Sequence, residues 1–256
     1  MTDFFEKMNE GYIQKNFPDG SIFGKVGKNV KRNGIIAIAI FFGPIFLASA
    51  YGCFWFLRRT LEMMAAGKED MGFGIGISVF LGIIALLFLL IIIYFLKAGN
   101  KKAEDYIASS AKNSELPASE IKCFEQQAFA SDCYILKLTA GLDRVLSNNT
   151  NKDGLLTRDY IYLADPRQTV IRVEDLRACS FEEYIYYVNN KRIRNLAIRL
   201  IASNGVTVRS DSTQEAGMAL MKMLTERNSA VDTNGGRVLQ EGKQVDEYFK
   251  KVLEKK

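Results

Sequence analysis

Hydrophobic and polar positions divide the chain into two contrasting parts. Residues 34–57 and 72–96 contain no Asp, Glu, Lys or Arg, whereas charged side chains are spread throughout residues 98–256. At about 1.5 Å per residue, a helix over either uncharged segment is long enough to cross a hydrocarbon core about 30 Å thick. The pattern predicts two membrane-spanning helices, with residues 58–71 as an external loop and residues 1–33 as a cytoplasmic or interfacial segment.

Basic residues beside the two predicted spans favour one orientation. Most lie before the first span or after the second, and fewer lie in the loop between them: Lys25, Lys28, Lys31 and Arg32 before; Lys97, Lys101 and Lys102 after; Arg58, Arg59 and Lys68 between. Loops rich in Lys and Arg stay in the cytoplasm. We therefore expect a two-pass protein of the cell (inner) membrane with both termini in the cytoplasm. The polar-rich residues 1–33 make the first span unlike a cleavable signal.

Small residues recur at four-residue spacing in both predicted spans, which allows helix backbones to approach closely. They are Ala48 and Gly52 in the first span and Gly72, Gly74, Gly76, Ser78 and Gly82 in the second. Packing within the hairpin is the simpler interpretation, and a homodimer face is the alternative. Pro44 predicts a kink in the first span. The lack of ionisable residues in either span disfavours a transporter or pump.

The N-terminal segment has apolar residues at helical spacing: Phe4, Phe5, Met8, Tyr12 and Ile13. Such a stripe is typical of a helix that lies on the membrane surface. Packing against the later domain explains it equally well.

The pattern becomes amphipathic after the second span. Residues 98–131 are predicted to be a helical connector. Within residues 132–228, short runs rich in β-branched and aromatic residues alternate with turn signals such as Asp153-Gly154 and Asn204-Gly205. These features predict an antiparallel β domain, although residues 133–145 fit a helix or a strand.

A helix is predicted to close this domain. Ser212 and Glu215 form a capping-box pattern for a helix that ends near Arg227, and its apolar stripe would cover an open barrel or sheet. Residues 229–256 are predicted to be a linker followed by an amphipathic helix.

A meander of strands closed by one helix is the outline of a pleckstrin-homology (PH)-like barrel. The chain resembles a family of bacterial membrane proteins of unknown function that have two adjacent spanning helices and a cytoplasmic PH-like domain. The resemblance is carried by GLLTRDYIYL (154–163), VIRVEDL (170–176), LAIRLIASNGVTVRS (196–210) and the helix after them. It implies a membrane-anchored α+β protein, in which a two-helix transmembrane hairpin precedes a PH-like antiparallel β barrel or sheet capped by a helix. It supplies no catalytic residue.

Composition narrows the classes of function. The chain has no histidine, the commonest general base and metal ligand, so we expect a protein that is not an enzyme and has no cofactor or metal site. The net charge of +5 arises largely from the basic flanks of the spans, which disfavours nucleic acid as a partner. The four cysteines fit buried, reduced thiols, and a Cys123–Cys133 disulfide is the alternative.

The densest basic cluster of the β domain is Lys191, Arg192 and Arg194, at a predicted hairpin turn. We interpret it either as a contact for anionic lipid or a partner, or as one side of cross-strand ion pairs with Glu182 and Glu183. Asn149 begins a stretch that resembles an EF-hand loop, but Tyr160 stands where the bidentate Glu is required.

These features predict a non-enzymatic, membrane-anchored module whose PH-like domain binds a protein or the inner leaflet. The expected partners are the lipid bilayer and either another membrane protein or a second copy. An accessory or scaffold subunit of a larger membrane complex is the alternative, and an enzyme that works without histidine is a third hypothesis.

Overall fold

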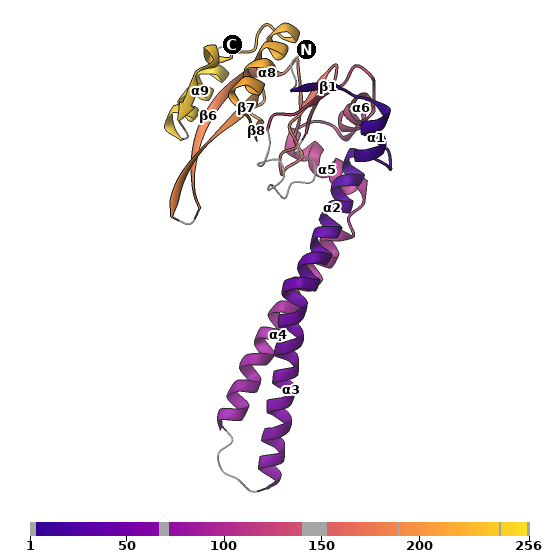
Figure 1. Ribbon diagram of the computed structural model, residues 1–256, viewed down its shortest axis with the longest axis vertical. Coiled ribbons are helices and arrows are strands. Elements are labelled where there is room, and N and C mark those ends of the chain that lie inside the picture. The colour runs from indigo at the N-terminus through magenta and orange to yellow at the C-terminus, as the bar shows by residue number, and fades with distance from the viewer. Residues whose placement is uncertain (1–3, 67–71, 140–152, 189, 241, 255–256) are drawn as a thin grey trace. The chain divides into compact units, whose positions relative to one another are not determined.

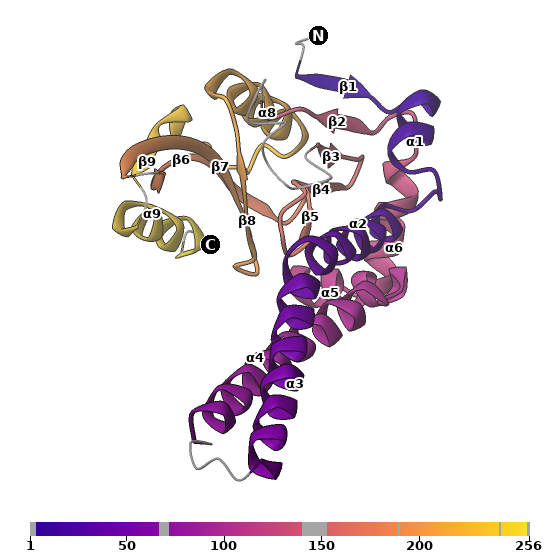
Figure 2. The same ribbon diagram turned by 60° about the horizontal axis from the view of Figure 1, so that its bottom comes forward.

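The computed structural model describes residues 4–66, 72–139, 153–188, 190–240 and 242–254. The chain divides into two compact units: Val26–Lys102, and Met1–Lys25 together with Ala103–Lys256. The first is a pair of long helices, and the second combines strands with shorter helices (Figures 1 and 2). The predicted order of a helical hairpin, sheets and a C-terminal helix is confirmed.

Two long apolar helices form the first unit. One runs through α2 (Ile22–Ala37), a π-helical turn η1 (Ile38–Phe42) and α3 (Gly43–Ala65), and α4 (Gly72–Gly99) packs against α3. Their most apolar 18-residue windows have mean hydropathies of 2.1 and 3.2, yet only 11% and 6% of those windows are buried. A core helix of a soluble protein would be mostly buried. By length and composition, both helices can cross a membrane.

The π-helical turn lies directly before Pro44, where the sequence predicts a kink. Proline has no backbone N–H, so a regular helical hydrogen bond is lost at this position. In η1 the N–H of Gly43 instead donates to the carbonyl of Ile38, one residue further back than in an α-helix. A Cβ atom on Gly43 would lie 2.7 Å from that carbonyl oxygen, so glycine is required for the closer turn.

The second unit contains two sheets. Sheet A is an antiparallel meander of β1 (Phe5–Lys7), β2 (Tyr134–Leu136), β3 (Gly154–Leu156), β4 (Tyr160–Tyr162) and β5 (Val170–Arg172). Sheet B has the order β8-β7-β6-β9, from β6 (Leu176–Val188), β7 (Lys191–Ala202), β8 (Thr207–Asp211) and β9 (Val238–Gln240). Strand β9 is parallel to β6, and the other pairs are antiparallel. The short strands of sheet A follow the predicted turn signals.

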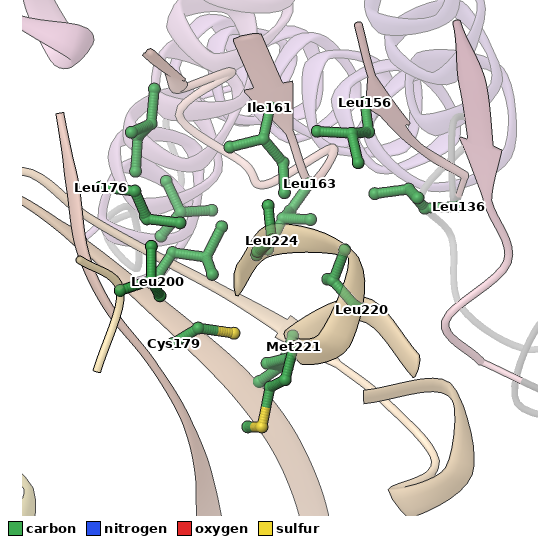
Figure 3. Close-up of a cluster of buried hydrophobic side chains, with 14 of the residues drawn as sticks. Leu136, Leu156, Ile161, Leu163, Leu176, Cys179, Leu200, Leu220, Met221 and Leu224 are labelled. Atoms are coloured by element: carbon green, nitrogen blue, oxygen red, sulfur yellow. The ribbon is translucent and has the colours of Figure 1, made fainter. Parts of the chain in front are cut away.

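Helix α8 (Gln214–Arg227) fills the core between the sheets (Figure 3). Its Leu220, Met221 and Leu224 pack with apolar residues of both sheets, such as Leu156 and Leu200. The predicted covering role of this stripe is therefore confirmed. The helix begins one residue later than the capping-box pattern indicates, because the Thr213 side chain accepts the N–H of Ala216 and the hydroxyl of Ser212 donates to the carbonyl of Thr213.

The N-terminal residues complete a second core on the other face of sheet A. Strand β1 pairs with β2, and Met8, Phe17 and Phe23 are buried against α5 (Ala103–Ser114) and α6 (Ala118–Ala128). The carboxylate of Glu125 on α6 accepts backbone N–H groups at the start of α2, at 2.8 and 3.3 Å. Of the two interpretations of this segment, the structure supports packing against the later domain, because α1 (Glu10–Asn16) and β1 belong to its fold.

The C-terminal residues cover the outer face of sheet B. Residues expected to be only a linker include a 3-10 turn, η2 (Asn234–Gly236), and strand β9, which extends sheet B beside β6. Helix α9 (Lys243–Glu254) then buries Val245, Phe249 and Val252 against Ala178 and Ile201. The predicted amphipathic helix is present, and its apolar stripe faces the sheet.

Candidate functional site

The predicted basic cluster lies at the end of the β6–β7 hairpin. The antiparallel ladder runs from Leu176↔Ala202 to Val188↔Lys191, but the last core residues along it are Phe181 and Leu196. Figure 1 shows the two strands continuing as a ribbon beyond the rest of sheet B. We call the described residues 184–188 and 190–195 the hairpin tip. None of its described side chains belongs to a hydrophobic cluster.

The register places apolar and basic side chains on one face of the hairpin tip. Tyr187 lies opposite Arg192, and Ile185 lies opposite Arg194. Residues directly opposite each other, and residues two apart along a strand, share a face of a sheet. Tyr187 is 71% exposed and Ile185 is 37% exposed. Two basic side chains therefore flank an exposed aromatic ring and an exposed aliphatic side chain.

All charged residues of the hairpin tip are basic. It contains Lys191, Arg192 and Arg194 and no acidic residue. Among the described residues, the one ion pair of the tip joins Arg194 to Glu183 at 3.8 Å, and the Arg194 side chain is 63% exposed. An exposed pair at that distance contributes little. Cross-strand ion pairing therefore accounts for only one of the three cations.

Glu182, the other acid expected opposite the cluster, forms ion pairs with arginines outside the hairpin tip. It is 1% exposed and faces α9, where it pairs with Arg199 at 2.6 Å and with Arg209 at 3.7 Å. The Arg199 guanidinium also lies over the ring of Phe249, 5.7 Å from its centroid. Adjacent residues of a strand point to opposite faces, so Glu182 and Glu183 do not converge on one substrate.

A polar network holds the base of the hairpin tip. The hydroxyl of Tyr184 donates to Asp211 at 2.6 Å and accepts from the amide of Asn195 at 2.7 Å, which ties β6, β7 and β8 together. Burial and the hydrogen bond to Asp211 raise the pKa of Tyr184 to about 12. The phenol therefore stays protonated at neutral pH, and the tip projects from a fixed base.

A separate polar cleft, which the sequence did not indicate, has a volume of about 660 Å³ and lies where α6, sheet A and the end of α8 meet. Three arginines line it. Arg172 contacts Asp175 at 2.7 Å and Glu174 at 3.3 Å, and Arg158 contacts Asp159 at 3.2 Å. The third, Arg227, donates to the backbone carbonyl of Thr157. Hydrogen bonds from Arg158 and Gln127 lower the pKa of Asp159. A ligand would have to displace these internal partners.

Two further features of the sequence analysis are the cysteines and the stretch that resembles an EF-hand loop. All four cysteines are free thiols, which contradicts the alternative of a Cys123–Cys133 disulfide. Burial raises the pKa of Cys133 to about 12. Asn149 lies outside the described residues, and within the described part of the chain no three His, Cys, Asp or Glu side chains are grouped to hold a metal ion.

The small residues of the helical hairpin separate into two faces. A Cβ atom on Gly52 would lie 2.9 Å from Leu81, Gly82 lies against Cys53, and Ser78 is buried. These three residues are in the α3–α4 interface. Ala48, Gly72 and Gly76 are exposed instead. The closest approach is between Gly74, a member of the predicted small-residue pairs, and Thr60: a Cβ atom on Gly74 would lie 2.2 Å from the Thr60 hydroxyl.

Comparison with known proteins gives no relative from which a role could be transferred: no family model, no curated protein and no solved structure matches the chain.

Proposed function

We propose that the chain is a non-enzymatic module that is anchored in the cell membrane by α3 and α4 and presents a cytoplasmic PH-like domain for binding. The observation that carries the proposal is the pair of long apolar helices whose surfaces are left almost entirely unburied by the protein. Such surfaces require hydrocarbon around them, because each apolar side chain left in water forfeits its transfer free energy.

The PH-like assignment draws its support from strand order. Strands β2–β5 form one antiparallel meander, β6–β8 form a second, and α8 closes the space between them. This is the order that the resemblance in sequence implies. In the proposed arrangement, β1, β9 and α9 are additions at the edges and on the outer face of the sheets.

The proposed orientation rests on the basic residues beside the spans. These residues favour an orientation with both termini, and with them the second unit, in the cytoplasm. The unit needs both of its segments on the same side, because the N-terminal Phe17 and Phe23 share a core with residues of α5 and α6. A hairpin of two spans satisfies that requirement.

Membrane extraction tests the proposal. The full chain should stay in the membrane fraction after treatment with alkaline carbonate and enter solution only with detergent. Recovery of the folded chain in solution without detergent would overturn the proposed anchor.

A second candidate is an accessory subunit of a larger membrane complex. Gly72 and Gly76 favour it, since they are exposed on α4 at the spacing that lets another helix approach. Purification in mild detergent separates the two: an accessory subunit retains one stoichiometric membrane partner, and the substitution Gly76→Leu should release it. Gly82→Leu is the matched comparison, since it acts within the hairpin.

A further inference from the structure

The chemistry of the hairpin tip points to a specific binding partner. We infer that the hairpin tip docks on the surface of an anionic bilayer, with Tyr187 and Ile185 at headgroup depth and its three cations against lipid phosphates. This inference rests on the proposed function, because it takes the membrane that holds α3 and α4 as the surface that is bound.

The exposed face of the tip has the composition of a membrane interface. Tyrosine is enriched at the headgroup level because its ring is apolar and its hydroxyl is polar. Tyr187 and Ile185 present such a surface, with Arg192 and Arg194 directly across the strand pair. Lys and Arg reach lipid phosphates from this position while their aliphatic stems stay beside apolar groups.

Packing within the described part of the fold does not explain why the hairpin tip exposes apolar side chains. The tip has two strands, and its described side chains lie outside every core cluster, so its apolar side chains do not stabilise the domain by burial. Hydrogen bonds of Tyr184 fix its base instead. A two-stranded ribbon of this kind is marginal by itself, and contact with a surface would stabilise it.

A bilayer fits the tip better than a folded protein does. A stable protein interface needs about 800 Å² on each partner, with complementary shape. Among its described side chains, the tip offers one exposed tyrosine, one exposed isoleucine and three cations. Each cation held near an anionic leaflet strengthens association about fivefold, so three give about a hundredfold. Only Asn100–Lys102 separate α4 from α5, and this short tether raises the effective concentration of lipid for the unit.

Tryptophan fluorescence of the full chain tests the inference. The full chain is required because the N-terminal residues complete the core of the unit. Trp55, the single tryptophan, is replaced by Phe, and Tyr187→Trp then reports on the tip. The protein is reconstituted into vesicles of phosphatidylcholine alone or mixed with phosphatidylglycerol, with brominated acyl chains as quenchers. We expect a blue-shifted, quenched emission in the anionic vesicles and an unquenched one in the neutral vesicles.

Two comparisons make the result specific. Ser203→Trp places the reporter in the turn between β7 and β8, at the other end of β7, and its emission should be unquenched in both kinds of vesicle. Adding Arg192→Glu and Arg194→Glu to Tyr187→Trp should abolish the quenching in anionic vesicles. Raising the ionic strength should weaken it, because salt screens exposed charges.

Other outcomes overturn the inference. Equal quenching in neutral and anionic vesicles would remove the role of the cations. Unquenched emission from the Tyr187→Trp variant, together with a crosslink from position 187 to an acidic protein or to a second copy of the chain, would assign the tip to that partner. In each of these cases a chain that resists carbonate extraction leaves the proposed anchor intact, whereas failure of that extraction removes both.

Discussion

The inner and outer halves of the β6–β7 ladder have the same backbone pairing and opposite surroundings. On the face toward α8, the inner half presents Phe181 and Ile198, which are fully buried. The same face of the outer half presents Ile185 and Tyr187 beside two arginines and leaves them exposed. The core of the domain explains the inner half, whereas the core gives no reason for the composition of the outer half, for which we propose binding to a membrane surface.

Replacing one isoleucine in each half should give the largest contrast. Ile198→Ala leaves a cavity in the core and should lower the free energy of unfolding by about 4 kcal/mol. Ile185→Ala removes a side chain that packs against no core, and the loss should be within about 0.5 kcal/mol. Urea unfolding in detergent micelles, followed by near-ultraviolet circular dichroism, measures both. Equal losses would mean that the outer half is packed like the inner half.

The neighbouring residues Glu182 and Glu183 allow a second comparison, between a buried and an exposed ion pair. Glu182→Gln leaves the guanidinium of Arg199 without its buried partner and should cost about 3 kcal/mol. Glu183→Gln affects only an exposed pair with Arg194 and should cost at most about 0.5 kcal/mol. The same unfolding measurement applies, and a larger effect at Glu183 would contradict the assignment of the two faces.

The cap of α8 provides a smaller test, because α8 covers only the inner half. Thr213→Ala removes the acceptor for the N–H of Ala216 and should destabilise the unit by about 1 kcal/mol. If Ser212 were the cap, as the sequence pattern indicates, Ser212→Ala would carry that loss instead. The ratio of the two shifts in urea midpoint decides between them.

Reversing charge at the tip should have the smallest effect on folding. Arg192→Glu combined with Arg194→Glu changes exposed side chains, so the free energy of unfolding should change by no more than about 0.5 kcal/mol. The same pair of substitutions should abolish the lipid contact that the Tyr187→Trp reporter detects. A large loss of stability would show that these arginines belong to the fold.

Much of the fold could be predicted because its strongest signals are local. Two uncharged segments of more than twenty residues leave few alternatives to spanning helices, and Asn204-Gly205 fixes a hairpin by its turn geometry alone. The hairpin turn that was predicted at the basic cluster lies between β6 and β7.

Contacts between distant segments could not be predicted. The apolar stripe of Met8, Tyr12 and Ile13 fits a membrane surface or a protein surface equally well, because both exclude water from the same face. Strand β9 has only three residues and lies within a Gly- and Asn-rich stretch, too short for a periodic signal.

The candidate site was predicted in part. The basic cluster is visible in the sequence, but its proximity to Tyr187 and Ile185 depends on the register of the ladder between β6 and β7. Counting outward from the turn at Asn190 pairs Tyr187 with Arg192, and that signal could have placed the two on one face. The role of Glu182 could not be found this way, since its partner Arg199 is set by the packing of α9.

The central claim is that α3 and α4 cross the membrane and leave the second unit on its cytoplasmic side. Reporter fusions after Lys256, expressed in bacterial cells, test it most directly. The account predicts that green fluorescent protein at this position is fluorescent and that alkaline phosphatase, which is active only outside the cytoplasm, is inactive. An active phosphatase after Lys256 would contradict the account.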